Sequence, residues 1–533
     1  MARIETMSYD FPGMRESNSI YVDKTQTFYD LIVSAPISAF YFISRPRRFG
    51  KSLMISTLES IFRGRKELFE GLAISKTDYD WPVHPVFRFD FSAITTSSLE
   101  DFQRAFASRV ALVLQDAGAT VDPALDPGTN FDHAIQELFE RSGKRVVVLV
   151  DEYDAPIGHT LDNLDFALAV RKMMADFYAI LKKNVDKIRF LMMTGVSKFS
   201  QVSVFSALNN IKDLTLDARA ATLLGYTEAE LETYFHEAMA AHAQVMGLDY
   251  EAYRAQLRFW YNGYHFARFH LGPESAVYNP YAISNTLADQ EPEFVPTWST
   301  TGKPSMLMNY LSREQLVKMD YENIPGVTED LMATSDLANL SAIALLFQAG
   351  YLTIKAYHSM AGYTLGIPDE EVRRDLLTIV TQSIAKRPPG DLWFSQTITA
   401  LTTRDFLEFF AHLKVLYADL PYHATEGAEI TESAYLRLLY CLLRSRFATT
   451  QVCFERQQTA TRPDLVLVFL DAVFIFELKV NRDGKTGAQT ALAQIRERNY
   501  AEAQRCHNLP IYAIGLSFDP KTHCLIDCAA EAL

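Results

Sequence analysis

Cysteine is scarce in this chain and occurs only near its end. The 533 residues include five cysteines, all within the last hundred positions: Cys441, Cys453, Cys506, Cys524 and Cys528. So few cysteines, in an odd number, exclude a disulfide-rich secreted scaffold and indicate a reducing compartment. One alternative is a zinc site built from the last three cysteines with His507 and His523, but the paired C-x-x-C spacing of structural zinc sites is missing. We therefore expect core and surface thiols.

Long hydrophobic runs are also missing. A membrane-spanning helix needs about 20 consecutive apolar residues. The two longest candidates, Leu340–Ile354 and Leu465–Phe476, are interrupted by polar or charged residues. The segment Met1–Phe11 carries Glu5 and Asp10 and has no apolar stretch of the kind that a secretory signal needs. We expect a cytoplasmic protein with no membrane partner.

Positive charge is in deficit. Lysine and arginine number 51 against 65 aspartates and glutamates, which gives a formal net charge of −14. This balance excludes a protein that coats nucleic acid, although it allows a local basic site. The remaining composition is ordinary, with 48% hydrophobic and 22% charged residues, and excludes a disordered, collagen-like or coiled-coil chain. At ~100–200 residues per domain, the length implies roughly three or four units.

Short apolar runs alternate with amphipathic stretches over the first 225 residues. Strands that alternate with helices indicate a parallel α/β sheet covered by helices. The expected strands are Ala39–Ser44, Val86–Phe91, Val146–Val150 and Arg189–Thr194, and the expected helices are Lys51–Phe62 and Leu99–Ala117.

The pattern becomes helical from Thr227, where Glu230 completes a capping box. A loop-rich aromatic junction follows over Trp260–Pro304. Further on, a helix over Leu337–Ala349, a two-stranded hairpin and a helix over Glu370–Thr381 are typical of a winged-helix element. The tail is predicted to be a compact α/β unit, with helices over Thr431–Arg446 and Thr490–Ala503, a hairpin over Leu465–Phe469 and Ala472–Lys479, and a strand over Ile511–Ser517.

A glycine-containing loop joins the first expected strand to the helix that follows it. Its sequence, Arg45-Pro-Arg-Arg-Phe-Gly-Lys-Ser52, ends as a phosphate-binding loop ends. Backbone N–H groups and the helix N-terminus would face phosphate oxygens, Lys51 would reach the β- and γ-phosphates, and Ser52 would bind Mg²⁺. The common pattern has glycine where this chain has Arg45. The candidate nucleotide-binding residues of the loop are Arg45, Arg47, Arg48, Phe49, Gly50, Lys51, Ser52 and Leu53.

Two further strand ends complete a nucleotide site. The apolar strand Val146–Val150 delivers Asp151 and Glu152 at its carboxyl end, and another strand ends at Thr194. Asp151 would hold Mg²⁺ through its water shell, Glu152 would orient or deprotonate the attacking water, and Thr194 would sense the γ-phosphate. The alternative is an α/β domain whose strand ends happen to be polar. The combination of motifs favours nucleotide binding.

A second constellation lies in the tail, where Asp464 opens one strand and Glu477 and Lys479 end the next. Alternate residues on a strand share a face, so Glu477 and Lys479 point the same way and hairpin pairing can bring Asp464 beside them. Two carboxylates and a lysine suit a metal-dependent phosphodiesterase, with Mg²⁺ or Mn²⁺ on Asp464 and Glu477. The alternative is an edge hairpin with solvated charges. Weaker candidates for the same site are Glu432, Gln494 and Tyr500.

Three other features have ordinary interpretations. The aromatic stretches Trp260–Tyr264 and Tyr278–Tyr281 would clamp a base or, as we favour, form the core of a domain junction. The basic stretch from Arg171 to Arg189 is a solvated helix face or a DNA track. Arg219 is a weak candidate for a finger or sensor arginine.

Together these strings resemble a bacterial and archaeal family whose members join a divergent AAA-like ATPase domain to a C-terminal nuclease domain of the PD-(D/E)XK superfamily. The resemblance extends over nearly the whole chain, and the family shares the arginine at position 45. Its marks are Tyr21-Val-Asp-Lys-Thr25, Arg45–Ser52, Val150–Pro156, Thr194–Val196, Asn209-Asn210, Trp260–Tyr264, Tyr278–Pro280, Gly350–Ile354, Pro463-Asp464, Glu477–Lys479, Gln494-Ile495 and Tyr500.

The resemblance implies an α/β multidomain protein with ATP and Mg²⁺ at the first site and nuclease chemistry at the second. The expected units are a P-loop ATPase domain over 1–225, a helical lid and aromatic junction over 226–305, a helical and winged-helix-like region over 306–425, and a restriction-endonuclease-like domain over 426–533. The expected function is an ATP-regulated, Mg²⁺-dependent nuclease acting on DNA. The alternative is a nucleotide-switch scaffold whose nuclease fold binds nucleic acid or protein without cleaving. A homo-oligomer is left open.

Overall fold

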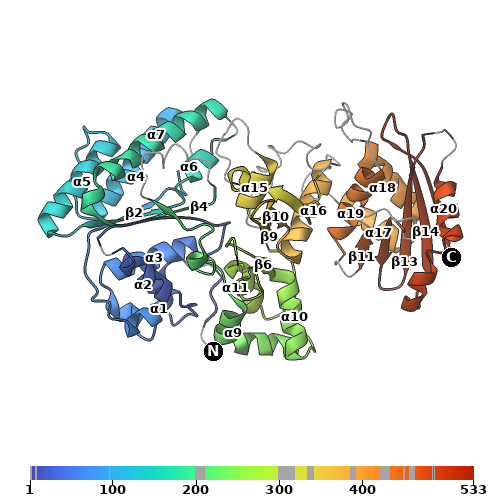
Figure 1. The fold of residues 1–533 in the computed structure, drawn as a ribbon, viewed down its shortest axis with the longest axis horizontal. Helices are drawn as coiled ribbons and strands as arrows, with labels where there is room; N and C mark the ends of the chain where they lie inside the picture. The colour runs from blue at the N-terminus through green and yellow to red at the C-terminus, as the bar shows by residue number, and fades with distance from the viewer. Residues whose placement is uncertain are drawn as a thin grey trace. The chain divides into compact units, whose positions relative to one another are not determined.

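A computed structural model of the chain consists of two compact units, which are described separately. The first comprises Met1–Thr297 with Tyr321–Asp369, and the second comprises Trp298–Asp320 with Glu370–Leu533 (Figure 1). The structure describes residues 3–6, 9–35, 37–94, 97–161, 163–197, 211–269, 271–297, 319–332, 341–384, 392–418, 432–447, 451–454, 463–482, 484 and 487–533. Both units are mixed α/β, as the sequence predicts.

A five-stranded parallel sheet forms the centre of the first unit. Its strands are β1 (Ala39–Ser44), β2 (Val86–Asp90), β3 (Val146–Asp151), β4 (Ile188–Gly195) and β5 (Lys212–Asp213), in the order β2-β3-β4-β1-β5. Every residue of β1 and β3 is buried, as expected for strands covered on both faces. The four strands expected from the sequence are confirmed to within two residues. All five run parallel, so their carboxyl ends share one edge.

Helices cover both faces of this sheet (Figure 1). On one face lie α1 (Phe11–Glu16), α2 (Thr25–Val33) and α3 (Lys51–Phe62), and on the other α4 (Leu99–Asp116), α5 (Pro127–Ser142) and α7 (Leu164–Lys183). Shorter turns are η1 (Lys66–Phe69), η2 (Ala73–Lys76), α6 (Ala155–Gly158), η3 (Val185–Lys187) and η4 (Ala218–Ala220). The helix predicted after the glycine loop has the expected bounds, because Gly50 sets its start.

A helical subregion follows the sheet in the first unit. It contains α9 (Glu228–Val245), α10 (Tyr250–Tyr261), β6 (Asn262–Tyr264), β7 (Val277–Tyr278) and α11 (Pro280–Ala288). The predicted capping box is confirmed, since Thr227 and Glu230 bond reciprocally to each other's backbone N–H. Tyr261, Tyr264 and Tyr278 are buried, so these aromatics form core, as favoured from the sequence.

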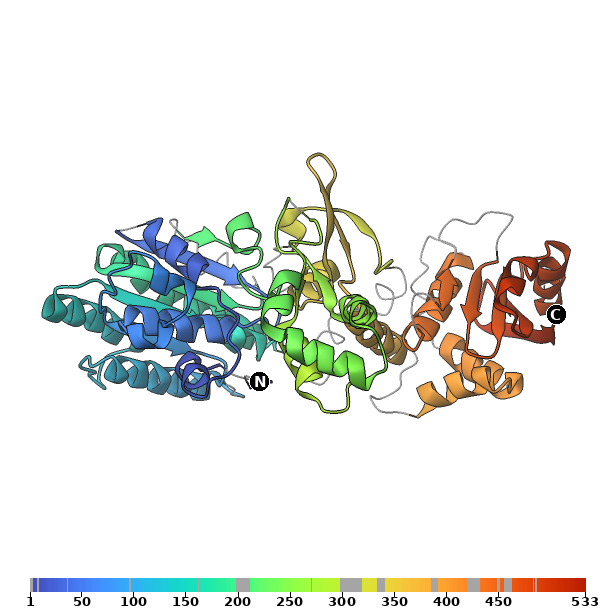
Figure 2. The same ribbon diagram turned by 90° about the horizontal axis from the view of Figure 1, so that it is seen from below.

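A three-stranded antiparallel sheet completes the first unit. It consists of β8 (Ile324–Val327), β9 (Thr353–His358) and β10 (Gly362–Gly366) in the order β8-β10-β9, with α14 (Glu329–Met332) and α15 (Ala342–Gln348) beside it in the chain. The predicted hairpin is confirmed and stands out from the unit in Figure 2, with Met360 fully exposed in its turn. The third strand, β8, was not predicted, because its proline and glycine hide the strand pattern. Residues 337–340 of the predicted helix lie outside the described residues.

The second unit places helices against a mixed sheet. Its helices are α16 (Glu370–Ile384), α17 (Trp393–Thr402), α18 (Phe406–Ala418), α19 (Glu432–Arg444), α20 (Ala488–Glu497) and η6 (Glu502–His507). Its strands, in sheet order, are β11 (Val452–Phe454), β12 (Leu465–Val468), β13 (Val473–Val480), β14 (Ile511–Phe518) and β15 (Leu525–Ala532).

The pairing of β13 with β14 is parallel and every other pair in this sheet is antiparallel. The crossover helix α20 packs against the sheet at Gly515, where an added Cβ would lie 2.3 Å from the carbonyl oxygen of Ala488. The helix predicted over Thr490–Ala503 corresponds to α20 but ends earlier, at Glu497, and a turn with Asn499 at φ 52° separates it from η6. In the part of the chain that the structure describes, every helix is too short or too polar to cross a bilayer.

Candidate functional site

The loop between β1 and α3 carries the predicted phosphate-binding residues and leads into α3 at Gly50. Arg48 and Gly50 both have left-handed backbone angles, with φ of 66° and 90°. Glycine adopts this conformation without strain, whereas an arginine adopts it only when its surroundings impose it. Gly50 is also the N-cap of α3, and it has no side chain with which to cap the first N–H groups of that helix. These groups are those that phosphate oxygens bind at helix N-termini.

Five of the predicted nucleotide-site residues meet at the carboxyl edge of the sheet. Lys51 is 4% exposed, and its Nζ lies 3.3 Å from Glu152 Oε1. Asp151 accepts hydrogen bonds from the hydroxyl groups of Ser52 and Thr194. The strand order explains this, because β4 lies between β1 and β3 and carries Thr194 next to its last residue, Gly195.

The electrostatics of this edge favour a cation. Burial, and then the neighbouring Glu152, raise the pKa of Asp151 above its ordinary value, while the Ser52 and Thr194 hydroxyls and Lys51 oppose the rise. A divalent cation would favour the ionised form of Asp151. Glu152 itself has a left-handed φ of 50°. Such strain in a non-glycine residue persists where the surrounding structure imposes it.

The side chain of Arg45 bonds to backbone carbonyls in the protein interior. Its Nη1 donates to the carbonyls of Ser44 at 2.9 Å and Thr215 at 2.8 Å, and its Nη2 donates to that of Ala220 at 2.9 Å. The guanidinium also lies 4.1 Å from the ring centroid of Phe266. Burial lowers the pKa of Arg45 to about 9. The sequence suggested a phosphate or a partner as its target, but the structure gives it three carbonyl oxygens.

The neighbouring loop residues also contact the helical subregion. Arg48 lies over the ring of Tyr281 at 3.8 Å, and the carbonyl of the exposed Arg47 accepts a hydrogen bond of 3.4 Å from Asn279. Phe49 is buried, with its ring edge-to-face against Tyr264. Residues of the helical subregion therefore help to hold the loop in place, in addition to the sheet. Arg219, a weak candidate from the sequence, forms an ion pair of 2.6 Å with Asp217.

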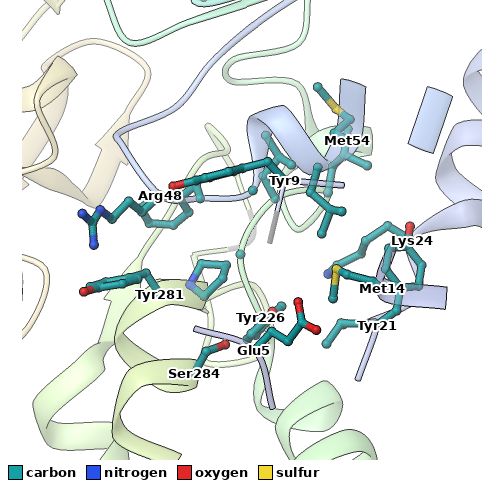
Figure 3. Close-up of a pocket in the computed structure, with 18 of the residues that line it drawn as sticks. Glu5, Tyr9, Met14, Tyr21, Lys24, Arg48, Met54, Tyr226, Tyr281 and Ser284 are labelled. Carbon is teal, nitrogen blue, oxygen red and sulfur yellow. The ribbon is translucent and has the colours of Figure 1, made fainter. Parts of the chain in front are cut away.

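A cavity of about 110 Å³ opens beside Gly50 (Figure 3). The N-terminal segment contributes Tyr9 and Tyr21, the loop region contributes Gly50 and Leu53, and the helical subregion contributes Tyr226, Tyr281 and Ser284. In Figure 3 the side chains of Arg48 and Tyr281 lie one above the other at one side of this cavity. Ligand pockets for whole drug-sized molecules occupy about 300–1,000 Å³, so this cavity suits a single ring system.

Sequence reasoning predicted the phosphate-loop part of the cavity lining but missed most of the other lining residues. Tyr281 was noted as a possible base clamp, and Tyr21 belongs to a string that carries the family resemblance. Tyr9 and Tyr226 have no motif around them. These residues come from three separate segments, so only the folded structure shows that they share a cavity.

The second candidate site lies at the end of β13. Glu477 Oε1 accepts hydrogen bonds from Lys479 Nζ at 2.8 Å and from the Gln494 side chain. Gln494 also donates to the Tyr500 hydroxyl at 3.3 Å. Asp464 Oδ2 accepts from the backbone N–H of Leu478 at 2.8 Å, which places Asp464 beside the same strand. The structure thus brings these predicted residues together. Glu432 Oε1 accepts from the backbone N–H of Val480 at 3.2 Å.

The carboxyl group of Glu477 is buried and only partly hydrogen-bonded. Glu477 is 2% exposed, and its Oε2 is buried with no hydrogen-bond partner among the described residues. Burial, and then Asp464, raise the pKa of Glu477 to about 7, although Lys479 opposes the rise. A buried carboxylate oxygen that accepts no hydrogen bond is costly unless a nearby charge compensates it. Asp464 and Glu477 therefore fit Mg²⁺, which uses one or two carboxylates together with water and substrate oxygens.

This buried carboxyl predicts a pH dependence of stability in the metal-free protein. The folded state holds the Glu477 proton more tightly than the unfolded chain, so stability falls as pH rises from about 4.5 to about 7. The expected loss is on the order of 1–3 kcal/mol. Melting temperatures across this range should show the fall for wild type and for Glu531→Gln, whose carboxylate pairs with Arg496 at 3.2 Å. Glu477→Gln should lack this component; an unchanged slope in that variant would contradict the prediction.

Other expectations have plain outcomes. Within the described ranges, no group of three or more histidine, cysteine, aspartate or glutamate side chains is arranged to hold a metal ion. Cys441 is buried and Cys506 is exposed, whereas the side chain of Cys453 and residues Asn209 and Asn210 lie outside the described residues. In the basic stretch, Lys183 pairs with Asp132 on the surface.

Comparisons with known proteins match one family to each end of the chain. The description "Predicted AAA-ATPase" matches residues 7–205, and "PD-(D/E)XK nuclease superfamily" matches residues 431–527. A protein of Azotobacter chroococcum mcd 1, described as an uncharacterized protein in the vnfD 5′ region, is 32% identical over 533 residues. That alignment covers 98% of each chain.

Proposed function

The chain belongs to the family that joins an AAA-ATPase-like domain to a C-terminal domain of the PD-(D/E)XK nuclease superfamily, and from this premise we propose that it is a cytoplasmic, ATP-hydrolysing, Mg²⁺-dependent nuclease. Its substrate is DNA, and its ATPase domain regulates the nuclease domain. The observation that carries the proposal is the pair of assembled side-chain sets, Lys51 with Glu152 at one site and Glu477 with Lys479 at the other.

At the first site, we assign the roles from the geometry. Lys51 and the first N–H groups of α3 bind the phosphates, while Ser52 and Asp151 hold Mg²⁺. When bound, the ion would neutralise the negative charge that develops on the transferred phosphoryl group. Glu152, at the edge of the same cluster, orients the attacking water. The base occupies the cavity beside Gly50, against Tyr281.

At the second site, Asp464 and Glu477 hold the metal ion, which can be Mg²⁺ or Mn²⁺. A metal ion held by these carboxylates would polarise the phosphodiester and favour attack by water. Lys479 lies 2.8 Å from Glu477 and stabilises the negative charge on the phosphate. Gln494 holds the Glu477 carboxylate in place and is itself held by Tyr500. Glu432 anchors the end of β13 and contributes a further carboxylate.

The test is a cleavage assay on the purified full chain with single-stranded, duplex and branched DNA. Mg²⁺ and Mn²⁺ are each supplied with and without ATP, and ATP hydrolysis is followed with and without DNA. We expect cleavage that EDTA stops and that ATP changes in rate. If the protein binds ATP but cleaves none of these DNA forms, the nuclease proposal is wrong and the alternative of a nucleotide-switch scaffold takes its place. A rate of ATP hydrolysis that is the same with and without DNA would show that the ATPase activity is not coupled to the nuclease activity.

The cavity yields a further prediction. Tyr281→Ala removes the ring beside which the base would lie, so ATP affinity should fall by about tenfold, a typical value for loss of one aromatic stacking partner. Tyr357→Ala in β9 removes a half-buried tyrosine from another part of the same unit and should leave the affinity unchanged. Equilibrium titration with Mg-ATP checks both. Equal affinities for the two variants would place the base elsewhere.

A further inference from the structure

Arg45 joins segments of the first unit that are far apart in the sequence. It is 1% exposed and is one of the largest fully buried side chains. Its guanidinium bonds to the end of β1 and to the carbonyls of Thr215 and Ala220 in the segment after β5, and it lies over Phe266, which follows β6. Each of these contacts is with backbone or with an aromatic ring of the protein itself.

We propose that Arg45 is a positioning residue that fixes the start of the phosphate loop from the side facing away from the nucleotide. Nucleotide affinity then depends on the contacts of the Arg45 side chain, although this side chain does not bind the nucleotide. This inference rests on the proposed nucleotide binding at Lys51 and Ser52. It explains how the loop functions without the glycine of the common pattern.

The physical reason is preorganisation. A loop that begins with glycine must lose more backbone freedom when its N–H groups converge on a phosphate. In this chain the start of the loop is already fixed, because Arg45 N donates to the Gly195 carbonyl at 3.2 Å and its side chain is held by three carbonyls. Ordering that is complete before binding does not reduce the affinity.

Phe266 links this anchor to the other end of the loop. Its ring lies under the Arg45 guanidinium and also packs edge-to-face on Phe49, with centroids 5.3 Å apart. Phe49 directly precedes Gly50, the N-cap of α3. One ring therefore supports both the first residue of the loop and the residue before its left-handed glycine.

The geometry requires arginine. A planar guanidinium presents several N–H groups in fixed directions and stacks on an aromatic ring, whereas lysine is a compact, strongly hydrated point charge. Lysine at position 45 cannot reproduce three carbonyl bonds and the stacking. Glycine would restore the common sequence pattern but would remove the anchor and leave a void beside Phe266.

The experiment measures Mg-ATP affinity of the full chain by equilibrium titration, together with its melting temperature without nucleotide. We expect Arg45→Lys and Arg45→Gly each to raise the Kd by about tenfold or more, equivalent to about 1.4 kcal/mol. The matched control is Arg189→Lys. Arg189 also donates to two backbone carbonyls, at 3.0 and 2.9 Å, but it stands at the other end of β4. This control should lower the melting temperature and keep the Kd within about twofold of wild type.

A wild-type affinity in Arg45→Gly, or an equal loss in Arg189→Lys, would overturn the proposal. If the Arg45 variants do not fold, Phe266→Leu takes their place, with an expected increase of about threefold in Kd. Hydrogen exchange of the amides from Arg47 to Lys51 without nucleotide should be faster in each loop variant than in the Arg189→Lys control. The titration and the exchange measurement together distinguish the proposed nucleotide binding from the proposed role of Arg45. A wild type that binds no ATP refutes the proposed function, while unchanged exchange in the variants refutes the role of Arg45.

Discussion

Glu477→Gln is expected to lower metal-dependent DNA cleavage by about a thousandfold or more, because the loss of a metal-binding carboxylate removes several kcal/mol of charge stabilisation. Glutamine has the same shape but no charge, so it leaves a buried oxygen that binds Mg²⁺ poorly. The variant should still fold, since it removes a carboxyl group whose ionisation is opposed by burial. Mg-ATP affinity should stay at the wild-type value.

Initial rates of cleavage on a labelled DNA substrate across a range of Mg²⁺ concentrations provide the measurement. Lys479→Ala should lose cleavage to a similar extent, because it removes the positive charge 2.8 Å from Glu477. Glu531→Gln, on β15 of the same unit, is the matched control and should cleave as wild type does. Undiminished cleavage in both site variants would show that the catalytic metal binds elsewhere.

Glu152→Gln is expected to reduce ATP hydrolysis by about 10²–10⁴-fold, the range typical for loss of a general base. ATP binding should survive or become tighter, because the variant removes the carboxylate that lies 3.3 Å from Lys51. Lys51→Ala should instead lose binding itself. The two variants therefore separate phosphate binding from water activation.

Phosphate release and Mg-ATP titration on the same preparations check this prediction. Glu137→Gln changes a surface carboxylate that pairs with Arg141 on α5 and serves as the control. If Glu152→Gln hydrolyses ATP at the wild-type rate, another residue must orient the water. If it loses binding together with hydrolysis, Glu152 acts on the structure of the site.

The sequence predicts those helices and strands whose own residues show a clear hydrophobic pattern and clear end signals. The strand β1 and the helix α3 have the expected bounds, because an apolar run, Gly50 and an amphipathic stretch follow one another directly. The strand β15 was missed, because its residues Leu525–Ala532 show no regular alternation of apolar and polar side chains and most of them are half-exposed or exposed. Its place in the sheet comes from pairing with β14, which a local pattern does not contain.

The same distinction applies to the sites. Lys51, Asp151 and Glu152 follow strands or open a helix, so parallel pairing alone brings them together. The direction of the Arg45 side chain depends on residues 215, 220 and 266, which are distant in sequence. The lining of the cavity at Tyr281 likewise depends on tertiary contacts. A single sequence contains the chemistry of these residues but not their distances.

The contacts of Lys51 have a consequence for how a nucleotide is exchanged. Its ammonium group already donates to the carbonyls of Arg45 and Pro46 at 3.1 and 3.2 Å, and it faces Glu152. An arriving phosphate therefore replaces existing partners, and a departing one is replaced in turn. Such a substitution gains less free energy than the capture of a phosphate by a lysine without partners. This arrangement suits an ATPase that turns over repeatedly. When the phosphate leaves, Lys51 can bond again to the two carbonyls and to Glu152.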